Sequence, residues 1–330
     1  MRCRSRLVQT TLTLFSAAIV LLAPATVPAF TQPSLSISAG NVTGANYAAS
    51  SAIAKIFNRK SAEYGVRLST VATEGALATI DNVVQGKTAF GIAQADRLQR
   101  AAKGVGPWAG KAQTGLRAVL ALQMETLTVV AASDREIGKI GDLKGKRVNI
   151  GAPGSSDNEY GAILLERYEV KPADVTLSEH PTALAAEFLQ KDDIDAYIYT
   201  VSHPNLSILE ASTGKRKVVL VPLDKKFIEQ VVDSNPLLLP AEIPTAFYPG
   251  LERQGVVPTI GVRAVLFTRN DMPEETVYRL VRDVMTNFDL FKRQHPALQG
   301  LTPREASAAA TVIPLHPGAE RYFREAGLAP

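Results

Sequence analysis

Short apolar runs alternate with helical patterns along most of this chain, and this alternation restricts the fold more than any other feature of the sequence. Residues 35–40 and 67–73 have the length and pattern of strands, whereas residues 44–58 carry apolar side chains at helical spacing. A helix at 75–86 and a strand at 89–94 continue the pattern. Strand–helix–strand repetition is typical of a parallel sheet with helices on both faces, so we expect an α/β fold.

A second unit of the same kind follows. Residues 117–132, rich in Val, Leu and Thr, are expected to form two strands. No flexible linker separates the two units, so we expect two α/β lobes, with lobe 1 at 30–125, lobe 2 at 126–222 and a return to lobe 1 at 223–330. The placement of 223–262 is left open. Further strands are expected at 148–151, 175–178, 196–200, 218–222 and 262–268, and helices at 157–168, 182–191, 274–294, 303–310 and 318–326.

The N-terminus has the layout of a secretory signal, which we assign to residues 1–29. Arg2, Arg4 and Arg6 precede an apolar stretch, and small residues then lead to a cleavage site after Ala29. The apolar stretch is shorter than the ~20 residues that a membrane-spanning helix needs. We therefore expect an exported, periplasmic protein whose signal peptide is cleaved near Ala29.

Cleavage would change the composition of the chain. It would remove Cys3, the only cysteine, so the mature protein would depend on a packed core rather than on a disulfide. It would also remove three arginines and leave 33 basic against 32 acidic residues. The pI of about 9.1 therefore reflects the signal in part, and it gives no argument for a nucleic-acid partner, which needs a clustered basic face.

Glycine and hydroxyl residues gather in four turns that follow predicted strands. Ligands of open α/β sheets bind at the carboxyl ends of strands, beside helix N-termini whose free N–H groups attract anions. Such residues also serve as ordinary turns and caps, so it is their repetition at four turns that indicates a site. The candidate residues in these turns are Asn41, Thr43, Gly44, Asn46, Tyr47, Thr73, Glu74, Gly75, Gly154, Ser155, Ser156, Thr200, Ser202 and His203.

Motifs of catalytic and metal sites are incomplete. Residues 86–88 resemble the end of a phosphate-binding loop, but Asp81 occupies the position where that loop needs a glycine. The four histidines lack the spacing of metal ligands. Asp192, Asp193 and Asp195 are expected to cap and solvate a helix-to-strand turn rather than to bind a metal. We therefore expect no cofactor, no metal and no catalysis.

Several short blocks, taken in their order and spacing, resemble one known family. The blocks are Gly40 to Tyr47, Thr73 to Gly75, Asn82 before Gly86, Gly91 to Asp96, Asp142 to Val148, Gly151 to Ser155, Asp195-Ala196, His203-Pro204, Ile243-Pro244, Tyr248 to Gly250, and Pro258-Thr259. Together they resemble the TAXI-type solute receptors of TRAP transporters across nearly the whole mature chain.

The resemblance implies a type II periplasmic-binding-protein-like fold, in which a ligand is held in a cleft between two α/β lobes and delivered to a separate TRAP-type membrane permease. It adds Gln94, Asp96 and Tyr248 to the candidate site. Tyr47 and Tyr248 are expected to line the cleft, because tyrosine offers both an apolar face and a hydroxyl. The chain departs from the usual residues of the family at Asn46, Glu74, Ala76, Ala89 and Ser202.

We therefore expect a monomeric, non-enzymatic receptor for a small organic acid, either glutamate-like or a dicarboxylate. The carboxylate is expected on the turn 154–156, at a helix N-terminus and opposite Thr43 and Asn46. Arg97 is the alternative anchor, because arginine can grip a carboxylate with two parallel hydrogen bonds.

Two other functions stay open at this point. One is a binding protein for an ABC importer or a sensor. The other is a secreted hydrolase with Ser155 or Ser156 as nucleophile, for which His203 is the one histidine placed to act as base.

Overall fold

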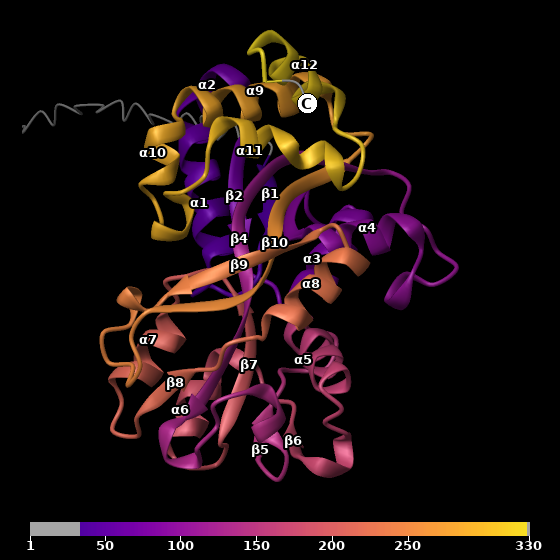
Figure 1. Cartoon of the computed structure of the whole chain (residues 1–330). Helices are drawn as coiled ribbons and strands as arrows, with labels where there is room; N and C mark the ends of the chain where they lie inside the picture. The colour runs from indigo at the N-terminus through magenta and orange to yellow at the C-terminus, as the bar shows by residue number, and fades with distance from the viewer. Residues whose placement is uncertain (1–33, 329–330) are drawn as a thin grey trace, which may run out of the picture. The chain divides into compact units, whose positions relative to one another are not determined.

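The computed structural model describes residues 34–328, so the expected signal peptide at 1–29 lies outside the described residues. Within that range ten strands form one mixed sheet, in the order β2-β1-β3-β10-β4-β7-β5-β6, with β8 beside β4 and β9 beside β10 (Figure 1). The expected α/β class is confirmed. The sheet is not wholly parallel, however, because two long antiparallel strands join two parallel groups.

The two parallel groups are called here the first half and the second half of the sheet. The first half consists of β1 (Ser34–Ser38), β2 (Arg67–Val71) and β3 (Phe90–Gln94), and the second half of β5 (Arg147–Asn149), β6 (Thr176–Ser178) and β7 (Ala196–Val201). Within each group every strand is followed by a helix, as the alternation of the sequence predicts.

The strands β4 (Leu116–Ala132) and β10 (Val256–Arg269) connect the halves (Figure 1). β4 pairs with β10 as far as Thr126 and with β7 from Thr126 onward. The prediction of two strands at 117–132 was wrong. The segment contains no glycine or proline to break it, and it is buried along almost its whole length, so it continues as one strand from one half into the other.

Helices cover the sheet beside the strands that they follow. They are α1 (Ala45–Phe57), α2 (Ser61–Tyr64), α3 (Ala76–Val84) and α4 (Ala95–Lys103) in the first half, and α5 (Ser156–Arg167), α6 (Ala185–Gln190) and α7 (Leu206–Thr213) in the second. β8 (Val218–Leu220), α8 (Lys225–Ser234) and β9 (Leu238–Pro244) precede β10, and α9 (Glu274–Thr286), α10 (Phe288–Lys292), α11 (Pro303–Ser307) and α12 (Pro317–Glu325) follow it.

The C-terminal helices pack on the first half of the sheet. One hydrophobic cluster joins Ile37, Ile53 and Phe90 to Val277 and Phe323, all of them almost fully buried. The segment 223–262, whose placement the sequence left open, packs through α8 on β9 and β10. The chain passes from the first half to the second through β4 and returns through β10, so segments from both ends of the described range build the first half.

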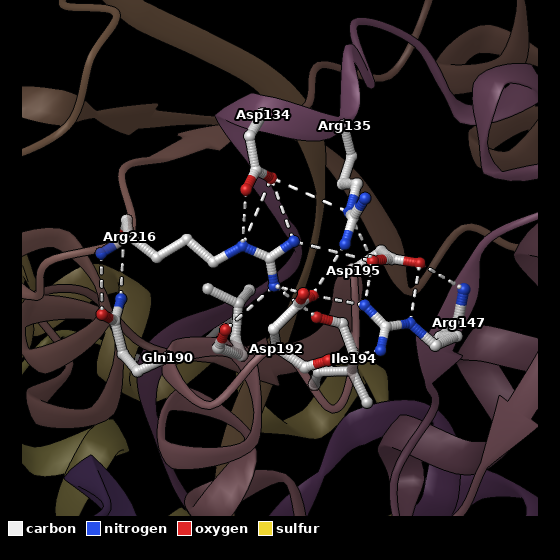
Figure 2. Close-up of polar contacts among 9 residues, drawn as sticks. Asp134, Arg135, Arg147, Gln190, Asp192, Ile194, Asp195 and Arg216 are labelled. Atoms are coloured by element: carbon white, nitrogen blue, oxygen red, sulfur yellow. Dashed lines mark hydrogen bonds and ion pairs between the residues drawn. The ribbon is translucent and has the colours of Figure 1, made fainter.

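An ion-pair network holds the turn between α6 and β7 (Figure 2). Asp195 is only 5% exposed and accepts hydrogen bonds from the backbone N–H of Arg147 at 2.8 Å and from its Nη2 at 2.6 Å. Arg135 Nε lies 2.8 Å from the same carboxylate. The expectation that this aspartate solvates the turn was therefore wrong. Further ion pairs in the network join Arg135, Arg147 and Arg216 to Asp192, and Arg216 to Asp134.

The network also fixes the charge of Asp195. Burial alone would raise the pKa of this carboxyl, but hydrogen bonds from Arg147 and the charges of Arg147 and Arg135 outweigh burial and hold the pKa well below its usual range. Among the described residues no group of His, Cys, Asp or Glu side chains is arranged to hold a metal ion.

Replacing Asp195 with Asn should lower the free energy of unfolding at neutral pH by ~2 kcal/mol, because three arginines would lose a largely buried counter-ion. A depressed carboxyl pKa stabilises the fold above the unfolded-state pKa, so this contribution should disappear as the pH falls into the acid range. Urea unfolding at neutral and acid pH measures both effects. The exposed neighbour Asp193, replaced with Asn, is the control; equal losses in both variants would contradict the account.

Candidate functional site

A cavity of about 230 Å³ opens where strands of both halves end. The turns after β1 and β2 and the end of β3 line it from the first half, and the turn after β5 and the end of β7 line it from the second. This is the edge of an open α/β sheet at which ligands are expected. The cavity therefore lies where the two parallel groups face each other across β4.

Three helices begin at this cavity. α1 and α3 are preceded by Gly44 and Gly75, which have no side chain to cap the first N–H groups. Gly75 has a φ of +139°, a conformation that side-chain-bearing residues rarely adopt. At α5 the hydroxyl of Ser155 accepts a hydrogen bond from the N–H of Asn158 at 3.2 Å. The positive ends of three helix dipoles thus point toward one cavity.

A chain of hydrogen bonds crosses the floor of the cavity. Gln123 Nε2 donates to Asn46 Oδ1 at 2.6 Å, and Asn46 Nδ2 donates to Glu125 Oε1 at 2.6 Å. The other carboxylate oxygen of Glu125 accepts from Gln94 Nε2 at 2.5 Å. Gln94 Oε1 then accepts from the hydroxyl of Ser156 at 3.0 Å, so the chain reaches from the first half to the first residue of α5.

Two carboxylates that line the cavity have raised pKa values. Burial raises the pKa of Glu125 to about 7, against the hydrogen bonds from Asn46 and Gln94, and the charge of Asp157 raises it further. Burial likewise raises the pKa of Asp157 to about 6, although its carboxylate accepts from the backbone N–H of Thr200 at 2.7 Å. Neither carboxylate has an ion-pair partner among the described residues.

The charged side chains that line the cavity are all acidic. They are Glu74, exposed at the rim, and the inner pair Glu125 and Asp157. No described Lys, Arg or His lines it. Arg97, the alternative anchor for a carboxylate, instead forms an ion pair with Glu159. Within the described lining, positive potential therefore comes from backbone N–H groups, and the charge of Arg97 acts on Asp157 from outside the lining.

Many of the predicted site residues converge on this cavity. Those that line it are Asn41, Gly44, Asn46, Thr73, Glu74, Gly75, Gln94, Ser155, Ser156, Thr200 and Ser202.

The expectation for the two tyrosines differs from the structure, in which neither lines the cavity. Tyr248 is fully buried, and its hydroxyl accepts from the N–H of Asn205 at 2.8 Å and shares a hydrogen bond of 2.6 Å with His203 Nδ1. Tyr47 is partly buried on α1. Thr43 is exposed and turns back to donate to Asn41 Oδ1 at 2.8 Å, so it does not face the turn 154–156 across the cavity as expected.

Gly154, Asp96 and Arg97 also lie outside the cavity lining. Gly154 precedes the residues of its turn that reach the cavity. Asp96 is buried in the first turn of α4, with Oδ2 3.8 Å from Arg97 Nε. The guanidinium of Arg97 lies over the ring of Tyr160 at 5.0 Å. These side chains pack α4 against α5, behind the cavity rather than in it.

Sequence reasoning missed the two inner carboxylates. Glu125 lies in a segment that was interpreted only as apolar strand, yet it is the single charged residue between Arg117 and Asp134. A lone charge in a buried strand is a signal of a site, because burial without a partner is unfavourable. Asp157 was predicted only as the first residue of the helix 157–168, and it lies in the first turn of α5.

Comparison with known proteins identifies the family. The sequence profile of the NMT1-like family matches residues 37–327. The chain belongs to the NMT1-like family. Among solved structures, a protein from Bordetella bronchiseptica RB50 aligns with a TM-score of 0.52 at 17% identity, over 89% of this chain and 98% of that one. An L-cystine ABC transporter protein from Listeria monocytogenes aligns with a TM-score of 0.50 at 12% identity, over 81% and 96%. The NMT1-like protein thus shares its overall α/β fold with these two proteins.

The serines of the NMT1-like protein lack the partner that a hydrolase needs. Ser155 caps α5, and Ser156 donates to Gln94. His203 does not line the cavity, and its Nε2 is 3.0 Å from the hydroxyl of Thr128. Burial lowers the pKa of His203 to about 3, so the ring is neutral near pH 7 and makes its two hydrogen bonds within the protein. No serine–histidine pair is formed at the cavity by the described residues.

Replacing Glu125 with Gln should make the stability of the NMT1-like protein less dependent on pH. Burial raises the pKa of Glu125 from about 4.5 to about 7, so folding becomes less favourable as the pH rises between these two values. Above this range, the Gln variant should exceed wild type by ~3 kcal/mol in free energy of unfolding, and the difference should vanish in acid. Urea unfolding as a function of pH measures this.

The exposed Glu63, replaced with Gln, is the control for that measurement. The groups that act on Glu125 are Asn46, Gln94, Asp157 and Asp96. If the free energy of unfolding of Glu125→Gln differs from that of wild type by the same amount at every pH, the pKa of Glu125 is not raised in the folded protein, and the account is contradicted.

Proposed function

We propose that this NMT1-like protein is a periplasmic solute receptor that captures a small organic acid and delivers it to a TRAP-type membrane permease. The cavity at the strand ends of both halves carries this proposal. It combines three helix N-termini with buried polar side chains in a site without a nucleophile–base pair among the described residues. Such a site is built to hold a solute rather than to transform it.

Closure around the solute is supported by contacts that cross between the halves. Ser156 of α5 is hydrogen bonded to Gln94, and Glu159, one turn further along α5, pairs with Arg97 and Arg100 of α4. We place the lobes at 30–125 with 223–330, and at 126–222. Two strands that run through both halves can bend as a hinge. The side-chain contacts between the halves would break when the site opens and form again when it closes around the solute.

An acidic solute is supported by the three helix N-termini. α1 and α3 expose N–H groups that no side chain caps, and these groups with the helix dipole favour a carboxylate. The absence of a lining arginine or lysine does not remove this preference, since backbone N–H groups alone bind anions at many helix N-termini.

The TRAP-type partner rests on the sequence resemblance, whose blocks 40–47, 73–75 and 151–155 surround the cavity. An ABC importer is the second candidate, because the L-cystine protein that shares the fold is described as part of an ABC transporter. Among residues 34–328, no helix is both long and apolar enough to cross a bilayer, so either partner would have to supply the membrane passage.

The NMT1-like protein, screened with amino acids and dicarboxylates in a thermal unfolding assay, should be stabilised by at least one acid. A ligand at ~100 times its Kd adds ~2.7 kcal/mol. Filling the cavity with Ala183→Phe should abolish that effect, whereas the exposed Ala173→Phe, which lies outside the cavity lining, should not. Stabilisation by no acid, or turnover of the bound compound, would contradict the receptor proposal.

The partner is tested by uptake. Vesicles that contain the TRAP permease should accumulate the acid only when the receptor and an ion gradient are present. Uptake that requires ATP and an ABC importer instead would assign the receptor to the second candidate.

A further inference from the structure

The inner wall of the cavity carries an unusual charge distribution for an acid receptor. Glu125 comes from β4 and Asp157 from the first turn of α5, and both line the same space. Each accepts hydrogen bonds from neutral groups, namely the amides of Asn46 and Gln94 and the backbone N–H of Thr200. Two partly or fully buried carboxylates thus face one cavity without a cation.

A second, independent feature of the same wall calls for a ligand. Ser202, at the end of β7, lines the cavity and is only 2% exposed. Its hydroxyl has no hydrogen-bond partner among the described residues. A buried hydroxyl without a partner is rare in folded proteins, because it loses its hydrogen bonds to water and gains none. A ligand atom that bonds to this hydroxyl would remove that deficit.

We propose that Glu125, Asp157 and the Ser202 hydroxyl form a subsite for the protonated amino group of the solute, so that the receptor selects an amino acid over a dicarboxylate. The inference rests on the proposed function and narrows its ligand class. An ammonium group has three N–H donors and one positive charge. The subsite offers two carboxylates and a hydroxyl as acceptors. The carboxylate of the same solute lies at the N-termini of α1 and α3, whose first N–H groups no side chain caps.

The electrostatics of the site agree with this assignment. Each inner carboxylate has a raised pKa because it is buried without a counter-ion, and an ammonium group would reverse that shift. A dicarboxylate would instead bring a second negative charge toward them. Its binding would require that Glu125 take up a proton, so it would weaken as the pH rises through about 7.

The decisive comparison uses pairs of ligands that differ only in the amino group. The full mature protein, freed of bound solute by unfolding and refolding, is titrated calorimetrically with the standard amino acids. Any amino acid that binds is then compared with its deaminated acid, as L-glutamate with glutarate or L-leucine with 4-methylpentanoate. We expect the deaminated acid to bind at least about tenfold more weakly, because it loses a charge-assisted hydrogen-bond group.

Variants test whether the named residues cause that preference. Asp157→Asn and Ser202→Ala should each reduce the ratio of the two affinities, while Glu166→Gln, an exposed carboxylate on the same helix, should leave it unchanged. The amino-acid affinity of wild type should rise between about pH 5 and pH 8 as Glu125 ionises. The titratable groups that act on the pair or lie beside it are Asp96, Arg97, Tyr160, Tyr199 and, at the rim, Glu74.

Three outcomes separate the hypotheses. Equal binding of an amino acid and its deaminated acid, or tighter binding of a dicarboxylate, would overturn the ammonium subsite and leave the acid receptor standing. Binding of neither class would overturn the acid receptor itself. If both Asp157→Asn and Glu125→Gln still prefer the amino acid to its deaminated acid, the assignment of these residues is overturned. If a variant fails to fold, the ligand comparison on wild type still decides whether the protein has an ammonium subsite.

Discussion

Glu125 lies on β4 next to Thr126, the residue at which this strand exchanges β10 for β7 as its partner. Its carboxylate accepts hydrogen bonds from α1 and from the end of β3, and through Gln94 it is connected to the start of α5. Elements from both halves of the sheet are thus tied to one buried acid. A buried carboxylate is stable only when its two oxygens accept hydrogen bonds. The elements that supply the donors must therefore keep their positions relative to one another.

This arrangement relates the architecture to the proposed function. The halves share two continuous strands, so they cannot separate, but side-chain contacts such as Ser156 with Gln94 and Glu159 with Arg97 can form and break. A solute that bonds both to Glu125 on β4 and to Asp157 on α5 would stabilise the closed arrangement by its own binding energy. The membrane partner would then recognise the closed shape of the receptor, which the bound solute stabilises.

The sequence predicted the place of the site better than its chemistry. Glycine and hydroxyl turns such as Gly44, Gly75 and Ser155 could be placed at strand ends, because strand–helix alternation determines where a chain reverses. The pairing partners of β4 could not, since antiparallel pairing between distant segments leaves no local pattern. Tyr248, which lies beside a Pro-Gly turn, was expected in the cleft. It is instead fully buried beside His203, a partner 45 residues away in the sequence. Arg97 was weighed as an anchor because its partner Glu159, 62 residues away, could not be foreseen.

The most direct test of the central claim is mass spectrometry of the small molecules that the protein carries when it is purified from the periplasm without refolding. The account predicts a stoichiometric amount of one small acid that also carries a primary amine, released by heat and absent from an Ala183→Phe variant. A stoichiometric ligand without a carboxylate would contradict the acid receptor. A dicarboxylate without an amine would contradict the role of Glu125 and Asp157.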